Sequence, residues 1–203
     1  MRFLTVPGYT GSGPDHWQTH LENTYEGFSR VVQDDWETVD RDRWVARLDE
    51  AVRAVDGEVF LVGHSCGSVT VAQWAATCHD ARVTGALLVA PADVEAPGAP
   101  AAIRRQAPLP ASVLPLPVHL VVSDDDPYLS RERGAALADA WGATVEVVPG
   151  GGHLATRDGY GPWDHVATLI ARHSGAVLKR RPGATAPGEL AGEDAVSAGM
   201  PPY

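Results

Sequence analysis

Ser65 has a sequence context that suits a nucleophile. It occupies the centre of a Gly-x-Ser-x-Gly pentapeptide, residues 63–67, with the apolar run 59–62 before it and a helix-like stretch, 68–76, after it. Between a strand and a helix this motif forms a tight turn, the nucleophile elbow, that holds the serine hydroxyl clear of the backbone. The glycines leave room where side chains would collide. The pattern favours a catalytic serine over an ordinary glycine-rich turn.

The general base for this serine is predicted in the loop after the last strand. A serine hydroxyl is a poor nucleophile at neutral pH, so it needs a base. His153 follows the predicted strand 144–148 and three consecutive glycines, 150–152, which let its side chain reach across a site. Of the other seven histidines, His64 lies beside the serine in the turn, so we predict a core or supporting role for it. His153 is therefore the predicted base.

The acid that orients this base is predicted in the aspartate run 124–126. The run follows the predicted strand 116–123, which gives the chain order serine, acid, histidine that suits this arrangement. Three adjacent carboxylates repel one another, so one can point at the histidine while two must face solvent or hydrogen-bond donors. Asp126 is favoured because Pro127 fixes the chain direction just after it, and Asp124 is the alternative.

A tetrahedral intermediate at the serine also needs donors for its oxyanion. The backbone N–H of Cys66, the residue after the serine, is the first predicted donor. The second is predicted in the glycine- and proline-rich loop 7–14, where Tyr9 and Thr10 are the candidates. Loops at the carboxyl ends of strands line the sites of open α/β sheets, so Tyr9 and His16 are also predicted to contact the substrate.

Apolar runs alternate with helical patterns along the chain, which is typical of βαβ units and a parallel sheet. Asp15 is expected to cap the first helix. We expect strands over residues 2–6, 29–33, 58–62, 83–90, 116–123 and 144–148, and helices over 15–25, 41–55, 68–76, 130–141 and 162–173.

Two stretches break this alternation. Residues 91–117 carry seven prolines and form either a small cap over the site or an ordinary long loop, with a turn or two of helix at 99–106. From residue 175 onward the chain is mostly alanine, glycine, proline and charged residues, which bury too little apolar surface to fold alone. We therefore predict one domain over residues 1–174 and a disordered tail over residues 175–203.

The composition is that of a soluble globular protein. The chain has 203 residues, 44% hydrophobic and 21% charged, which suits one domain with a substantial core. A net charge of −10 argues against nucleic acid as a partner, and no apolar run approaches membrane-spanning length. Cys66 and Cys78 have neither a disulfide framework nor a zinc-ligand spacing. We expect a cytoplasmic monomer or weak homodimer with no metal and no organic cofactor.

Several short motifs together resemble a known family. They are Pro-Gly-Tyr at 7–9, His-Trp-Gln at 16–18, Asp-Asp-Trp at 34–36, the serine pentapeptide, the aspartate run with its flanks at 123–128, Gly-His-Leu at 152–154 and Gly-Tyr-Gly-Pro-Trp at 159–163. In this order the chain, over about residues 1–173, resembles the small serine hydrolases of the α/β-hydrolase superfamily that include vertebrate retinoblastoma-binding protein nine and its bacterial relatives.

The resemblance implies a reduced α/β-hydrolase fold: a mostly parallel central sheet, helices on both faces and little or no cap. In that family the aspartate directly before the proline is the acid, which implies Asp126. The family also implies that Trp17, Trp36 and Trp163 pack around the site, with Trp163 next to the substrate. The L-x-C-x-E motif of the vertebrate protein is absent around both cysteines, so its partner binding is not expected here.

We therefore predict a serine hydrolase that cleaves a small carboxylic ester or a related acyl compound through Ser65, His153 and Asp126. The same triad suits a thioesterase, a peptidase, or an acyltransferase or cyclase of a biosynthetic pathway, because all of these form an acyl-enzyme. A binding protein that keeps the fold without turnover is the alternative from another class, since one fold hosts many functions.

Overall fold

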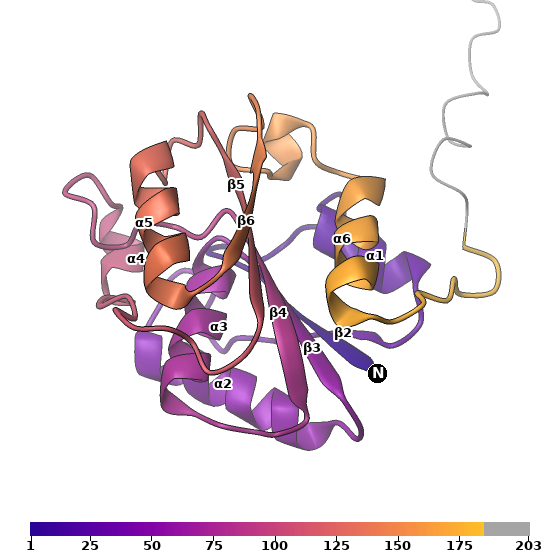
Figure 1. Ribbon diagram of the computed structural model, residues 1–203. Coiled ribbons are helices and arrows are strands. Elements are labelled where there is room, and N and C mark those ends of the chain that lie inside the picture. Colours follow the sequence, from indigo (N-terminus) through magenta and orange to yellow (C-terminus); the bar gives the residue numbers. More distant parts are fainter. Residues whose placement is uncertain (185–203) are drawn as a thin grey trace, which may run out of the picture.

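The computed structural model describes residues 1–184 of the chain, and the remainder lies outside the described part. Within these residues six parallel strands form one sheet in the order β2-β1-β3-β4-β5-β6 (Figure 1). This parallel sheet confirms the predicted fold class. The strands are β1 (Arg2–Val6), β2 (Phe28–Arg30), β3 (Val59–His64), β4 (Val83–Val89), β5 (Val118–Ser123) and β6 (Thr144–Val148).

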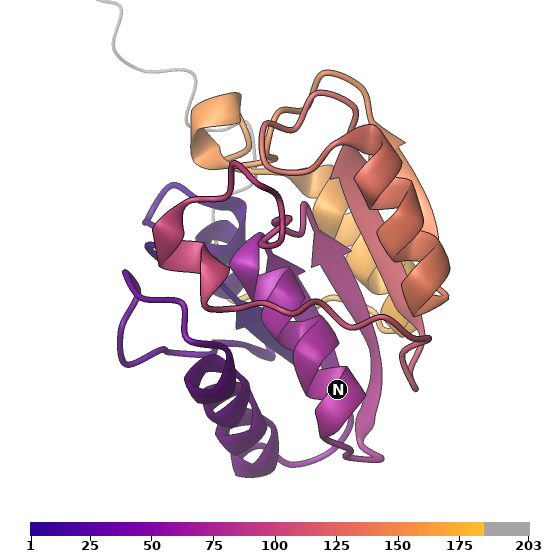
Figure 2. The same ribbon diagram turned by 90° about the vertical axis from the view of Figure 1, so that its left-hand side faces the viewer.

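Helices cover both faces of the sheet. Figure 2 looks onto the face covered by α2, α3 and α5, with α6 behind the sheet, and Figure 1 shows α1 beside α6 on that second face. Each face has its own apolar core, one around Trp44 of α2 and one around Trp17 of α1. The helices are α1 (Trp17–Thr24), α2 (Arg41–Ala54), α3 (Cys66–Thr77), α4 (Ala101–Arg104), α5 (Arg131–Trp141), the 3₁₀ turn η1 (Thr156–Asp158) and α6 (Asp164–Ser174).

The strand that leads to the serine is buried along its whole length, because helices cover both of its faces. The strand extends two residues further than expected, to His64. One cap prediction is wrong: His16 rather than Asp15 caps α1, since its Nδ1 accepts a hydrogen bond from the Gln18 N–H at 3.2 Å. The imidazole thereby becomes part of the loop that enters the site.

The first residues of the predicted tail lie against the turn between α1 and β2. The Glu26 N–H donates to the Lys179 carbonyl and the Arg181 N–H donates to the Thr24 carbonyl, both at 2.8 Å. Leu178 packs against the apolar core on this face. Most of the predicted tail lies outside the described residues, so its disorder and the domain boundary stay predictions. Within residues 1–184 no helix is long and apolar enough to cross a membrane.

Candidate active site

Ser65 lies at the sharp turn between β3 and α3. Its φ of 55° and ψ of −124° are values that residues other than glycine rarely adopt, so the backbone is strained at this position. The flanking glycines are required by close approach of the backbone. A Cβ on Gly63 would lie 2.6 Å from the Ser68 Cα, and one on Gly67 would lie 1.9 Å from the Val6 carbonyl oxygen. The pentapeptide therefore forms the turn that its spacing predicts.

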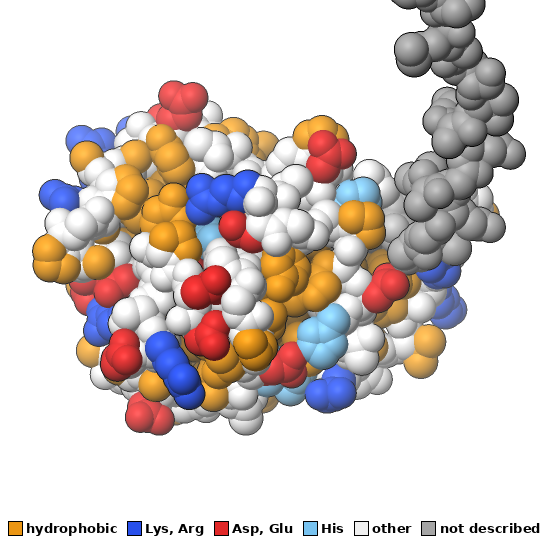
Figure 3. Space-filling model, turned by 90° about the horizontal axis from the view of Figure 1, so that it is seen from above, with side chains coloured by type: hydrophobic (Ala, Val, Ile, Leu, Met, Phe, Trp, Pro, Cys, Tyr) orange, Lys and Arg blue, Asp and Glu red, His pale blue; other side chains and the backbone are white. Residues whose placement is uncertain are grey.

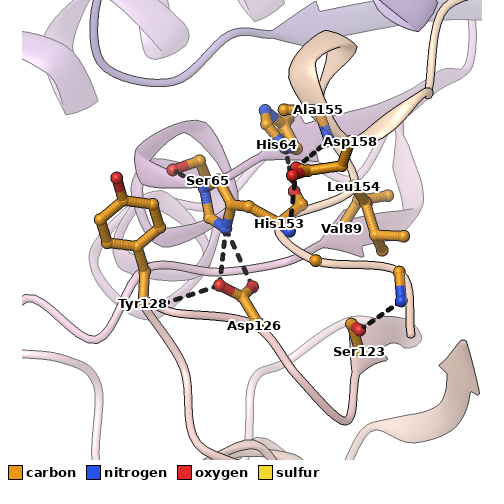
Figure 4. Close-up of polar contacts among 12 residues, drawn as sticks. His64, Ser65, Val89, Ser123, Asp126, Tyr128, His153, Leu154, Ala155 and Asp158 are labelled. Carbon is orange, nitrogen blue, oxygen red and sulfur yellow. Dashed lines mark hydrogen bonds and ion pairs between the residues drawn. The ribbon is translucent and has the colours of Figure 1, made fainter. Parts of the chain in front are cut away.

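The structure brings Ser65, His153 and Asp126 together (Figure 4). The His153 Nε2 lies 2.8 Å from the Ser65 Oγ, and its Nδ1 lies 3.0 and 2.9 Å from the two carboxylate oxygens of Asp126. All three side chains are buried. Because Nδ1 donates to a carboxylate, the neutral imidazole has its lone pair on Nε2, where it accepts the serine hydroxyl proton.

Each of the three consecutive aspartates has its own partner. Asp124 accepts a hydrogen bond from the Gly150 N–H at 2.8 Å, and Asp125 accepts one from the Gly152 N–H at 2.7 Å. Asp126 is the aspartate that contacts the imidazole. The expectation that two of them must find solvent or donors agrees with these contacts, since the donors are backbone N–H groups of the histidine loop.

The loop that carries His153 is also held from its other side. The Asp158 Oδ2 accepts hydrogen bonds from the His153 N–H at 3.0 Å and the Ala155 N–H at 3.2 Å. The Tyr128 ring packs edge-on against the imidazole, with ring centres 4.7 Å apart. Figure 4 shows Tyr128 and Asp158 on opposite sides of the ring. Neither residue was predicted to support the histidine, because neither stands in a recognisable catalytic spacing.

One of the two candidates for the second oxyanion donor is wrong. The Thr10 N–H donates to the Trp36 carbonyl at 2.9 Å, so it is not free for a substrate. The Tyr9 N–H instead faces the Cys66 thiol. Burial raises the pKa of this thiol to about 12, although the nearby Tyr9 N–H acts to lower it. The loop runs so close that a Cβ on Gly8 would lie 2.8 Å from the serine Cβ. Among the described residues no backbone carbonyl accepts from the Tyr9 N–H, so Tyr9 remains the candidate beside the Cys66 N–H.

Two further histidines lie next to His153 in the site. The His64 Nε2 donates to the His153 carbonyl at 3.0 Å, and the His16 ring centre lies 4.7 Å from that of His64. Since the His16 Nδ1 accepts from Gln18, its neutral form has the proton on Nε2, a buried atom without a partner among the described residues. Burial and the charge of Arg30 lower the pKa of His16 to about 4. His16 is therefore a neutral donor at pH 7.

A cavity of 410 Å³ opens beside Ser65. Tyr9 and His16 line it, as expected, and so does His64, for which we predicted a core or supporting role. Trp163 is not among the described residues that line this cavity. Its ring packs against Trp17 instead, with centres 5.9 Å apart, so it supports the site from outside.

The proline-rich segment acts as the small cap that was one of its two predicted roles. Pro100 and Ile103, at and within the single turn of α4, line the cavity. The buried Gln106 ties the segment to the start of α3: its Nε2 donates to the Cys66 carbonyl at 2.7 Å and to the Thr70 hydroxyl at 2.9 Å. This glutamine was not predicted from the sequence, because its partners lie 36 and 40 residues away.

Comparison with known proteins agrees with this geometry. The model of the family described as serine hydrolase matches residues 3–172, which is most of the chain. No curated protein matches the sequence significantly. The finer resemblance to the retinoblastoma-binding-protein-nine group stays a prediction.

Solved structures share the fold over most of its length. A protein described as a YdeN-like hydrolase from Pectobacterium atrosepticum is 28% identical, with a TM-score of 0.78 over 88% of this chain and 92% of that one. The type II thioesterase BorB of the borrelidin biosynthetic cluster is 18% identical, with a TM-score of 0.64 over 88% and 92%. The ydeN gene product of B. subtilis is 16% identical, with a TM-score of 0.63 over 86% and 99%. The last two likenesses concern the fold alone.

Proposed function

The chain belongs to the serine hydrolase family, and from that premise we propose that it hydrolyses a small carboxylic ester or a related acyl compound at Ser65. The observation that carries this proposal is the continuous hydrogen-bonded path from Asp126 through His153 to the Ser65 Oγ, next to a cavity large enough for a small substrate. Such a path activates a serine hydroxyl for attack on a carbonyl carbon.

In the first half of the reaction the Ser65 Oγ attacks the carbonyl carbon while its proton passes to the His153 Nε2. The carbonyl π electrons move to oxygen and form the oxyanion of a tetrahedral intermediate. Asp126 keeps the imidazole in the required tautomer and stabilises the imidazolium. The intermediate then expels the leaving group, which takes the proton from His153, and an acyl-enzyme remains on Ser65.

In the second half a water molecule replaces the leaving group. His153 accepts a proton from the water as its oxygen attacks the acyl carbon, and a second tetrahedral intermediate forms. Its collapse returns the electron pair and the proton to the Ser65 Oγ and releases the carboxylic acid. The N–H groups of Cys66 and Tyr9 donate to the oxyanion in both halves, and each such donor contributes roughly 3 kcal/mol.

His16 has the role of a hydrogen-bond donor to the substrate in this proposal. Its Nε2 is buried and has no partner in the described part of the protein, and the residue lines the cavity. A buried donor without a partner costs about 1–3 kcal/mol, which a substrate oxygen offsets on binding. An acceptor oxygen beside the scissile group is therefore part of the proposed substrate.

Fluorophosphonate labelling followed by intact-mass spectrometry tests the proposal. The wild-type chain is expected to gain one adduct, and Ser65→Ala none, while Ser130→Ala, which removes a serine outside the site, still gains one. No adduct on folded wild-type protein would overturn the proposal and favour a binding protein. Turnover of oxygen esters and thioesters that share one acyl group then separates an esterase from a thioesterase.

A further inference from the structure

Among the described residues that line the cavity beside Ser65, Arg157 is the one with a formally charged side chain. Among the described residues that line it, the others are glycines, apolar residues, Thr, Tyr, Ser, Cys and His, with no Asp, Glu or Lys. The whole chain has 26 acidic and 16 basic residues, so the positive charge of the cavity is opposite in sign to the net charge of the protein. Figure 3 views this end of the molecule, where acidic side chains are scattered among hydrophobic ones.

The guanidinium group of Arg157 is oriented by Tyr128 and forms one long ion pair with Asp158, without a hydrogen bond. Its central carbon lies 5.3 Å from the centre of the Tyr128 ring, and the Tyr128 hydroxyl raises the pKa of Arg157, which keeps it charged. The nearest carboxylate is that of Asp158, with 3.8 Å between the Arg157 Nε and its Oδ1, which is too long for a hydrogen bond. The other oxygen of Asp158 accepts from the His153 and Ala155 N–H groups.

Arg157 is also linked to the base through one ring. Tyr128 contacts both the guanidinium and the His153 imidazole. In the proposed mechanism His153 gives its proton to the leaving group. Arg157 therefore lies on the same side of the cavity as His153, the residue that protonates the leaving group in the proposed mechanism.

We propose that Arg157 binds an anionic group, a carboxylate or a phosphate, on the leaving-group side of the substrate. A guanidinium offers a planar set of N–H donors that matches the oxygens of either group. This inference rests on the proposed function, and it narrows the substrate to an acyl compound whose leaving group is negatively charged. Arg157 acts here as a specificity residue and takes no part in bond breaking.

Matched esters test the inference. Anionic leaving groups are provided by 4-acetoxybenzoate and 4-acetoxyphenyl phosphate, with methyl 4-acetoxybenzoate as the neutral counterpart. The pair mono-4-nitrophenyl glutarate and 4-nitrophenyl butyrate places the charge on the acyl side instead. After correction for uncatalysed hydrolysis, the wild-type kcat/KM should favour an anionic leaving group by about fivefold, the effect of a partly exposed charge pair. A preference confined to the acyl-side anion would overturn the inference.

Variants of Arg157 locate the effect. Arg157→Gln should bring the ratio of anionic to neutral kcat/KM close to one, and Arg157→Lys should keep part of the preference. Arg53→Gln is the matched control, since it removes the same charge from the end of α2, outside the described lining of the cavity, and should leave the ratio as in the wild type. If Arg157→Gln lowers both rates equally and leaves the ratio unchanged, Arg157 only supports Tyr128 and the inference is wrong.

Binding measurements separate this inference from the proposed function. Calorimetry on Ser65→Ala should show 4-acetoxybenzoate binding about fivefold more tightly than its methyl ester, and Ser65→Ala/Arg157→Gln should show no difference. This result supports the inference even if the wild type hydrolyses none of the esters, in which case the proposed function alone fails. Hydrolysis of neutral esters at Ser65 with no anion preference in rate or binding overturns the inference alone.

Discussion

The Asp125 carboxylate accepts a hydrogen bond from the Gly152 N–H at 2.7 Å, one residue before His153. The neighbouring Ser123 hydroxyl accepts from the Gly151 N–H at 2.9 Å. The loop after β5 therefore holds the loop after β6 through successive backbone groups. Together with the hydrogen bond from the Gly150 N–H to Asp124, these contacts set the position of the imidazole, because flexible glycines alone would leave it free to move.

Replacement of the two aspartates should separate an acid that contacts the imidazole from one that positions its loop. Asp126→Asn is expected to lower kcat about 10⁴-fold, because an amide favours the wrong tautomer of His153. Asp125→Asn keeps an acceptor oxygen for Gly152, so we expect a loss of no more than about tenfold. Steady-state kinetics on one ester measures both. Equal losses would contradict the assignment of Asp126. Asp124→Asn is the control, because it removes one negative charge from the same run of three aspartates.

The backbone strain at Ser65 predicts that replacement by glycine stabilises the fold relative to replacement by alanine, while both replacements abolish activity. Its φ of 55° suits glycine, and backbone strain of this kind costs about 1–3 kcal/mol. Ser65→Gly should therefore unfold with a free energy about 1 kcal/mol higher than Ser65→Ala, which keeps the Cβ and the strain. Both variants should lose about 10⁶-fold in kcat. Urea unfolding compares them, and equal stability would mean that the turn is not strained.

Much of the fold and the centre of the site could be predicted from local patterns. A continuous apolar run such as residues 83–90 predicts a strand buried on both faces. The alternation of such runs with helical patterns predicts that the strands of the sheet are parallel. Ser65, Asp126 and His153 each follow a predicted strand, and parallel strands end at one edge of the sheet. Their meeting at hydrogen-bond distance is what that topology requires.

The missed features depend on contacts between distant segments. The choice between Tyr9 and Thr10 needs the Trp36 carbonyl, which removes the Thr10 N–H from the site. Arg157 enters the cavity only because the loop after His153 folds back as a 3₁₀ turn. Neither contact has a periodic or spaced signal, so the sequence alone does not reveal them.

Gly67 should be the least replaceable glycine of the elbow. A Cβ at this position would lie 1.9 Å from the Val6 carbonyl oxygen and 2.6 Å from that of Pro7, and a shift of these backbone atoms would have to displace the chain itself. Gly67→Ala is expected to cost more than about 3 kcal/mol of unfolding free energy. Gly98→Ala is the control, since no atom lies within 4 Å of its Cβ position and a change within about 0.5 kcal/mol is expected. Chemical denaturation of both variants tests the difference.

The buried histidines predict that the protein loses stability in mild acid. Burial is the main cause that lowers the pKa of His16 to about 4, and the charge of Arg30 adds to this effect. Burial also lowers the pKa of His64 well below its ordinary value. In the unfolded chain both titrate near 6.5. The unfolded state therefore binds more protons between pH 6.5 and 4, so the stability present above pH 6.5 falls as the pH decreases through that window.

His16→Gln isolates one of these groups, because glutamine keeps a neutral N–H donor and has no proton to gain. The wild type should lose up to about 3 kcal/mol through His16 between pH 6.5 and 4, and His16→Gln should show a correspondingly shallower decline. The exposed His79 provides the control, since His79→Gln should follow the wild-type profile. The three profiles are compared through unfolding free energies measured at half-unit steps from pH 7.5 to 4.5. A decline in His16→Gln as steep as that of the wild type would show that His16 is not held neutral by the fold.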